Sequence, residues 1–159
     1  MSLVIRAMPW DDPAGETLRS AQQNEISVRY GTPDSEPGPK PTAADISVFL
    51  VAFDVSADGN ETPVGCGGLR TLDDVHGEIK RMYVIPERRG TGISTAVLTA
   101  LEREARGRGW ERVVLETGDQ QQDAVRFYER EGYTSIPLFG YYADSPLSLC
   151  YEKVLWPLP

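Results

Sequence analysis

One loop of the chain combines positive charge and small residues in a way that suits a phosphate group. It contains Arg88, Arg89, Gly90 and Gly92. The loop follows an apolar run that ends at Ile85, and it precedes a segment whose apolar residues recur at helical spacing. The first N–H groups of a helix have no partner inside the helix, and small residues let an anion approach them closely. We therefore predict a strand, a phosphate-holding loop and a helix.

The same loop has two other interpretations. Gly90 and Gly92 fit the first glycines of a dinucleotide-binding fingerprint, and Glu116 lies at about the expected distance downstream. Thr95 occupies the place of the third glycine, which weakens this alternative. A helix start that binds no ligand also stays open. A P-loop is excluded because no lysine follows the glycines.

Three segments in this part of the chain match a known order of motifs. Residues 78–84 resemble a signature strand, and residues 124–133 resemble a later helix followed by a strand. Between them, residues 89–94 resemble the signature Q/R-x-x-G-x-G/A, with Ser94 in place of the usual glycine or alanine. In this order the motifs resemble those of the GNAT superfamily of acyl-CoA-dependent N-acetyltransferases.

The resemblance implies an α/β (α+β) fold over residues 1–159 as a single domain. Its mixed, mostly antiparallel twisted sheet would have about six to seven strands flanked by helices, with two central parallel strands that splay apart. Hydrophobic spacing and turn residues predict helices at 14–29, 92–105 and 120–131. They predict strands at 2–7, 46–55, 63–72, 78–85, 110–116, 133–136 and 147–155.

By the same resemblance, the opening between the splayed strands would hold the pantetheine arm of acetyl-CoA. The backbone of Met82 and Val84 would bind the thioester and the arm, and Gln121 stands where the family often has an asparagine. The residues expected to bind acetyl-CoA are Met82, Tyr83, Val84, Arg88, Arg89, Gly90, Thr91, Gly92, Ile93, Ser94, Gln121 and Tyr128.

Acetyl transfer to an amine needs an unprotonated amine, a polarised carbonyl and a proton for the leaving thiolate. The resemblance implies that Tyr128 is the general acid and Glu78 the general base. Glu78 precedes Met82 by roughly 13 Å of extended strand, so it would act through water. Glu116 and Asp73 compete for the role of base. For Tyr128 the alternative is a packing role on an apolar helix face.

The expected reaction is direct transfer from acetyl-CoA to a primary amine of a small molecule. The residues considered for contact with that acceptor are Glu25, Arg29, Tyr30, Arg70 and Glu116. Ordinary surface charge is the alternative for these residues, and Arg70 in particular is expected to be exposed. A protein N-terminus or lysine as acceptor stays open, as does a noncatalytic acyl-CoA-binding or protein-interaction module. The proline-rich segment 32–42 is interpreted as either a lid or a plain connector.

Composition limits the partners. The chain has 159 residues, a formal net charge of -8 and a pI near 4.7. This acidity argues against a nucleic-acid partner and mildly favours a cationic amine. No apolar run approaches membrane-spanning length, and the first residues do not resemble a secretory leader. We therefore expect no membrane partner and a cytoplasmic location.

The cysteines and the histidine limit which disulfides and metal sites the chain can form. Cys66 and Cys150 lie in apolar, strand-like contexts and are expected to be buried, reduced thiols. His76 is the only histidine and no metal-ligand spacing occurs, so no metal is expected. Homodimerisation through the terminal strand or Trp156 is a further expectation.

Overall fold

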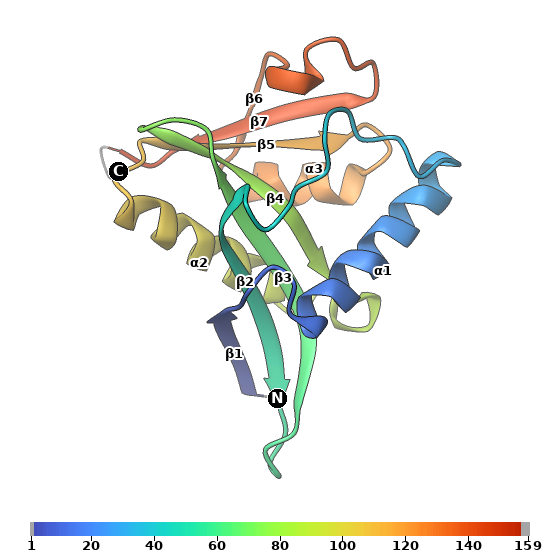
Figure 1. Cartoon of the computed structure of the whole chain (residues 1–159), viewed down its shortest axis with the longest axis vertical. Coiled ribbons are helices and arrows are strands. Elements are labelled where there is room, and N and C mark those ends of the chain that lie inside the picture. Colours follow the sequence, from blue (N-terminus) through green and yellow to red (C-terminus); the bar gives the residue numbers. More distant parts are fainter. Residues whose placement is uncertain (1, 157–159) are drawn as a thin grey trace.

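The computed structural model describes residues 2–156, which surround one sheet with the strand order β1-β2-β3-β4-β5-β7-β6 (Figure 1). The strands are β1 (Ser2–Ala7), β2 (Ile46–Val55), β3 (Glu61–Thr71), β4 (His76–Val84), β5 (Arg112–Gly118), β6 (Thr134–Ile136) and β7 (Ser148–Val154). The helices are α1 (Pro13–Tyr30), α2 (Ile93–Gly107) and α3 (Gln122–Arg130), with short 3-10 turns η1 (Pro86–Arg88) and η2 (Gly140–Tyr142). Residues 1 and 157–159 of the predicted domain lie outside the described part.

The sheet is antiparallel except between its two central strands. β4 and β5 run parallel and pair only from His76 with Arg112 to Ile79 with Leu115. Beyond that point β4 continues to Val84 and β5 to Gly118, and the two strands diverge (Figure 1). The predicted mixed sheet with splayed central strands is therefore confirmed.

A bulge in β4 begins where its pairing with β5 has ended. The register between β3 and β4 shifts so that Arg81 and Met82 lie opposite the single residue Gly67. Arg81 has a φ of 60, a left-handed conformation that side chains other than glycine rarely adopt. A Cβ at Gly67 would lie 2.5 Å from the sulfur of Met82. The bulge therefore packs Met82 against the bare backbone of β3 at Gly67.

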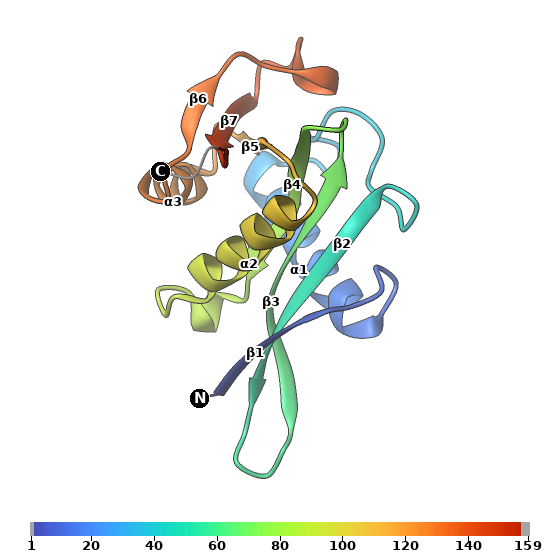
Figure 2. The same cartoon turned by 90° about the vertical axis from the view of Figure 1, so that its left-hand side faces the viewer.

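Helices cover both faces of the sheet (Figure 2). The larger apolar cluster contains α2 and α3 residues such as Val97, Leu101 and Tyr128, and the smaller cluster contains Leu18 of α1. α1 begins where the Asp12 carboxylate accepts a hydrogen bond from the N–H of Ala14 at 3.1 Å. It ends at Gly31, whose φ of 71 suits glycine. These local signals explain why α1 follows its prediction closely.

The strand predicted at 110–116 is displaced to Arg112–Gly118. The cause is Trp110, whose N–H donates to the carbonyl of Ala105 at 3.1 Å and so still belongs to the end of α2. Its indole ring is buried against Gly77 of β4. Trp110, which the sequence pattern assigns to the start of a strand, therefore precedes β5 and packs against β4 instead.

Cys66 and Cys150 are buried free thiols, as predicted. Among residues 2–156, no helix is both long and apolar enough to cross a membrane.

The contact between Trp110 and Gly77 gives a stability prediction. A Cβ at Gly77 would lie 2.2 Å from Cζ3 of Trp110, so Gly77→Ala should lower the free energy of unfolding by about 1–3 kcal/mol. Gly107→Ala is the matched control, because a Cβ there meets nothing within 4 Å. It should leave the stability unchanged or raise it by up to about 1 kcal/mol. Urea unfolding of both variants measures the difference, and equal stabilities would contradict this packing.

Candidate active site

A cleft of about 340 Å³ extends from the end of β4 to the start of α2. Its walls come from the end of β4, the loop after η1, one side of α1 and one side of α3. All the residues predicted to bind acetyl-CoA line it except Thr91, whose hydroxyl donates to the carbonyl of Arg88 at 2.5 Å. The structure therefore brings the predicted cofactor residues together, and their binding role stays a prediction.

The N-terminus of α2 is open to this cleft. Gly92 is the N-cap residue with a φ of 90, and no side chain caps the helix. Gly90 has a φ of 78, and a Cβ at either glycine would meet nothing within 4 Å. The backbone therefore takes a left-handed course that glycine adopts without strain, and it leaves space beside the uncapped N–H groups. Such a helix end favours an anion such as a phosphate.

The two arginines of this loop are paired with carboxylates of the protein. Arg89 donates from both terminal nitrogens to Glu25, at 2.9 Å and 3.0 Å, and from Nε to the carbonyl of Val84 at 3.0 Å. Arg88 pairs with Asp54. The side chains of Arg89 and Glu25 are 43% and 32% exposed, so water screens this ion pair and a phosphate can compete for the arginine.

A second, smaller cavity of about 100 Å³ adjoins the cleft, and we call it the inner cavity. It lies between α1, the segment that follows α1, β4, β5 and α3. Met82, Gln121 and Tyr128 line both the cleft and the inner cavity. The two spaces therefore meet beside these residues.

The residues proposed for acceptor contact separate into three places. Tyr30 and Glu116 line the inner cavity, and the hydroxyl of Tyr30 accepts from the N–H of Gln120 at 2.9 Å. Glu25 and Arg29 line the cleft instead. Arg70 lines neither space. It is only 15% exposed and pairs with Glu78, so the expectation of an exposed surface arginine is wrong.

Tyr128 presents a protonated phenol at the junction of the two spaces. Its side chain is buried, and its ring packs against the rings of Phe127 and Tyr133 with centroids 5.1 Å and 5.6 Å away. Burial raises the pKa of the Tyr128 hydroxyl above its ordinary value because the phenolate would be poorly solvated. This group therefore keeps its proton at neutral pH.

Glu116 places a carboxylate on the inner cavity. Burial raises the pKa of this carboxyl above its ordinary value, and the hydroxyl of Ser148, which donates to Oε2 at 2.6 Å, works in the opposite direction. The negative charges of Glu36 and Glu78 raise the pKa further, while the positive charge of Lys80 lowers it. A carboxylate with a raised pKa accepts a proton more readily than an exposed one.

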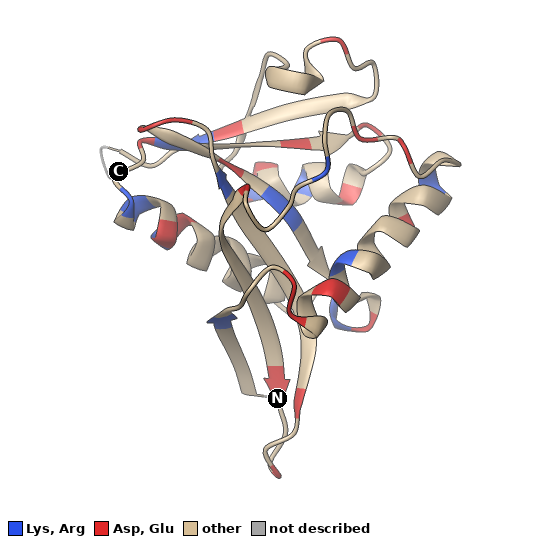
Figure 3. Ribbon diagram, viewed as in Figure 1, with Lys and Arg blue, Asp and Glu red and all other residues tan. Residues whose placement is uncertain are grey.

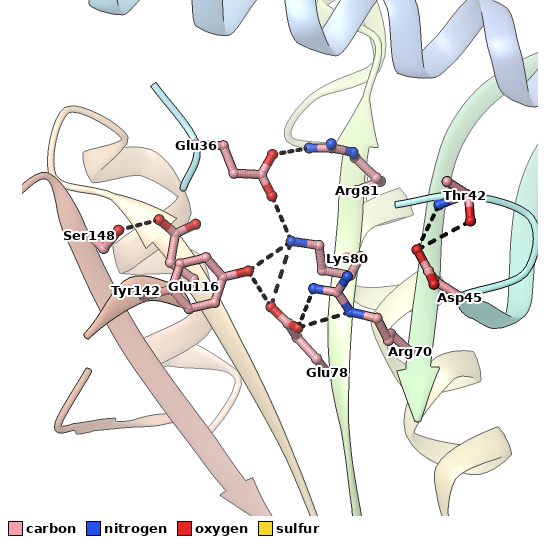
Figure 4. Close-up of polar contacts among 10 residues, drawn as sticks. All are labelled: Glu36, Thr42, Asp45, Arg70, Glu78, Lys80, Arg81, Glu116, Tyr142 and Ser148. Atoms are coloured by element: carbon pink, nitrogen blue, oxygen red, sulfur yellow. Dashed lines mark hydrogen bonds and ion pairs between the residues drawn. The ribbon is translucent and has the colours of Figure 1, made fainter. Parts of the chain in front are cut away.

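Glu78 is buried and already bonded on both oxygens (Figure 4). Oε1 accepts from Arg70 at 2.9 Å and 3.3 Å, and Oε2 accepts from the hydroxyl of Tyr142 at 2.6 Å. Glu78 is not among the residues that line the cleft or the inner cavity. Asp73, the other competing carboxylate, is exposed in the turn before β4 and accepts from the backbone of Val75 and His76.

Sequence reasoning missed the most highly charged part of the inner cavity. Lys80 and Arg81 of β4 both bind Glu36, which lies in the segment between α1 and β2. Figure 3 shows this basic segment in the middle of β4. Two consecutive cations between the apolar residues Ile79 and Met82 were the available signal, because buried cations need partners. Their partner lies 44 residues away from Lys80, where the sequence gives no sign of the pairing.

Within residues 2–156, no group of three or more His, Cys, Asp and Glu side chains is arranged to hold a metal ion.

Comparison with known proteins supports the resemblance seen in the motifs. The family model described as "Acetyltransferase (GNAT) family" matches residues 18–133. An "IAA acetyltransferase" from Azospirillum brasilense is 40% identical over 95 residues, which span 59% of this chain and 62% of that protein. The alignment thus covers less than two thirds of this relative's length.

Solved structures agree over nearly the whole chain. A crystal structure described as an acyl-CoA N-acyltransferase from Klebsiella pneumoniae has a TM-score of 0.79 and 28% identity, with 97% of this chain and 98% of that chain covered. A paia N-acetyltransferase from Thermoplasma acidophilum, solved in complex with coenzyme A, has a TM-score of 0.68 and 21% identity, with 97% and 99% covered. The second likeness concerns the fold alone.

The open glycine loop gives a binding prediction. Gly90→Glu places a carboxylate beside the uncapped N–H groups, where it competes with a phosphate. It should raise the dissociation constant of acetyl-CoA by about tenfold or more, which is the size of effect expected when a charge-assisted hydrogen bond is lost. Gly59→Glu is the control, since Gly59 has a similar φ of 88, equally free space around its Cβ position and no place in the cleft. Titration calorimetry compares both variants with the wild type. Equal affinities in all three proteins would contradict the assignment of the loop.

Proposed function

Since the chain belongs to the acetyltransferase (GNAT) family, we propose that it moves an acetyl group from acetyl-CoA to the primary amine of a small molecule. The observation that carries this proposal is the meeting of the cleft and the inner cavity at Tyr128, with Glu116 on the wall of the inner cavity. A proton donor and a proton acceptor thus face the place where two substrates would meet. The named activity of the Azospirillum relative supports a small-molecule acceptor.

The donors beside the cleft support acetyl-CoA as its ligand. The uncapped N-terminus of α2 and the open space at Gly90 and Gly92 would receive the pyrophosphate. The diverging ends of β4 and β5 leave backbone groups near Met82 for the pantetheine arm, although the Met82 carbonyl accepts from Gln22 at 2.7 Å. Bound there, acetyl-CoA would supply a thioester carbonyl that an amine can attack.

The proposed chemistry is a direct transfer with balanced proton movements. The amine nitrogen forms a bond to the carbonyl carbon while the bond between that carbon and sulfur breaks. Glu116 takes one proton from the amine nitrogen, directly or through one water, and Tyr128 gives its proton to the sulfur. Water then returns a proton from Glu116 to Tyr128.

Glu78 stays a prediction as the general base, but its contacts favour Glu116. Both oxygens of Glu78 are bonded to Arg70 and Tyr142, and deprotonating an amine would require one of these bonds to break. Glu116 accepts a hydrogen bond from Ser148 at one oxygen and lines the inner cavity. We propose that Glu78 holds Tyr142 and Lys80 in position.

The function is tested by measuring free-thiol release from acetyl-CoA against a panel of amines, with mass spectrometry of the products. We expect amine-dependent release and an acetylated amine. Binding of acetyl-CoA without release for any small amine, protein N-terminus or lysine peptide would favour a noncatalytic module. Release with peptides only would favour a protein acceptor.

The general acid gives a kinetic prediction. Tyr128→Phe should lower kcat by about 100-fold or more while leaving the dissociation constant of acetyl-CoA nearly unchanged, because only the proton donor is removed. Tyr141→Phe is the control, since Tyr141 is 66% exposed. An unchanged kcat in Tyr128→Phe would assign Tyr128 to packing.

The general base gives a pH prediction. Ser148 stabilises the charged form of Glu116, so Ser148→Ala should raise the pKa of this carboxyl further. The general base must be unprotonated, and the acidic limb of the kcat/KM profile should therefore move to higher pH in Ser148→Ala. A limb that stays in place in this active variant would exclude Glu116 as the titrating base.

A further inference from the structure

Two neighbouring cations of β4 hold one carboxylate between them in the inner cavity (Figure 4). Lys80 Nζ donates to Oε1 of Glu36 at 2.6 Å, and Arg81 donates from a terminal nitrogen to Oε2 at 2.6 Å. The side chains of Lys80 and Arg81 are 6% and 9% exposed, and that of Glu36 is 22% exposed. The arrangement is a bidentate carboxylate site built from buried donors and filled by the protein's own side chain.

The charges around this site leave Glu36 as the main counterion of the cations. Glu78 also lies 3.6 Å from Lys80, but its oxygens are bonded to Arg70 and Tyr142. Glu116 accepts from the hydroxyl of Ser148 at Oε2, and the ion pairs that the structure gives Lys80 are with Glu36 and Glu78. Removing Glu36 without replacement would leave buried positive charge unpaired, which is costly. The site therefore requires an anion, whether that anion is Glu36 or another group.

Glu36 belongs to a segment that makes few other polar contacts with the sheet. Residues 32–45 form no helix or strand and contain four prolines. The other hydrogen bonds that the structure gives this segment are local, as from the backbone of Asp34 to Thr32 and from Thr42 to Asp45. Gly38 lies against the ring of Tyr141. The ion pairs of Glu36 are thus the strong contacts that hold the segment over the inner cavity.

The inner cavity also contains polar atoms without partners. Within the described residues, Oε1 of Gln22 and Nε2 of Gln23 are buried and accept or donate no hydrogen bond. Both residues line the inner cavity. Buried polar groups are normally satisfied, so polar groups of a ligand or of water in this cavity can complete these two atoms.

We propose that Lys80 and Arg81 form an acid-binding subsite for the acceptor, and that Glu36 is an internal ligand which the acidic group of the acceptor replaces. The acceptor is then an amine that also carries a carboxylate or a phosphonate. This inference rests on the proposed acetyl transfer. It deepens that proposal by placing the acidic end of the acceptor at β4 and the amine near Glu116 and Tyr128.

Exchange of one carboxylate for another explains how a cavity of about 100 Å³ admits a substrate. The acidic group of the acceptor accepts the hydrogen bonds that Lys80 and Arg81 otherwise donate to Glu36, so neither cation is left unpaired. The side chain of Glu36 and its segment move out, which enlarges the space. A neutral amine supplies no anion for Lys80 and Arg81. If it displaced Glu36, these two buried cations would have no counterion, which is unfavourable.

The test compares matched acceptors in the wild-type protein and in Glu36→Gln. β-Alanine and 3-aminopropanamide differ only in their acidic group. In Glu36→Gln the kcat/KM for β-alanine should rise by about tenfold, since the competing charge-assisted bonds are removed, while the amide, which supplies no anion for Lys80 and Arg81, should gain much less. Asp34→Asn is the control, because it removes the same charge from the same segment without touching Lys80 or Arg81.

A binding measurement separates this subsite from the catalytic proposal. Propanoate, which has no amine, should raise the melting temperature of Glu36→Gln at about tenfold lower concentration than in the wild type or Asp34→Asn. Equal propanoate responses in the three proteins would overturn the subsite, as would equal gains for β-alanine and the amide. If no amine is acetylated by any variant, the proposed function fails, and the propanoate titration alone decides the subsite.

Discussion

The parting of β4 and β5 is the constraint on which the rest of the site depends. Two parallel strands that pair with each other only as far as Ile79 and Leu115 leave the facing edges of both ends without a partner strand. Such backbone must be satisfied by side chains, water or a ligand. The carboxyl ends of parallel strands are also where open sheets bind their ligands. The cleft, the bulge at Arg81 and the approach of α1 and α3 all follow from this one separation.

Charge inside the molecule is organised around the same opening. Arg70, Glu78, Tyr142 and Lys80 form a continuous chain of contacts that ends at Glu36. Across the gap, Glu116 and Ser148 lie on β5 and β7 (Figure 4). Buried charges contribute little stability compared with well-packed apolar residues. Their position on the walls of a cavity is better explained by the recognition of a charged substrate than by folding.

Local patterns predicted the parts of the site that local rules control. The glycines at 90 and 92, the helix after them and the position of Tyr128 follow from turn chemistry, helical spacing and a family resemblance. The cap at Asp12 and the stop at Gly31 likewise fix α1 from its own residues. In each case the contacts that determine the local structure join residues close together in the sequence.

Contacts between distant residues could not be predicted in this way. Glu36 lies 44 residues from Lys80, and Tyr142 lies 64 residues from Glu78. A charged residue looks the same in sequence whether it is exposed or paired, which is why Arg70 was expected at the surface and Glu36 was overlooked. The start of β5 was misplaced for a similar reason, since Trp110 is held by the carbonyl of Ala105 and by Gly77, and the contact with Gly77 joins distant residues.

Direct transfer requires both substrates to occupy the adjoining spaces at once. Initial rates measured while acetyl-CoA and an acceptor amine are both varied test this requirement. We expect double-reciprocal lines that intersect, as is required when a ternary complex precedes chemistry. Parallel lines, together with an acetylated protein isolated in the absence of amine, would contradict direct transfer by showing that the acetyl group first passes to the protein.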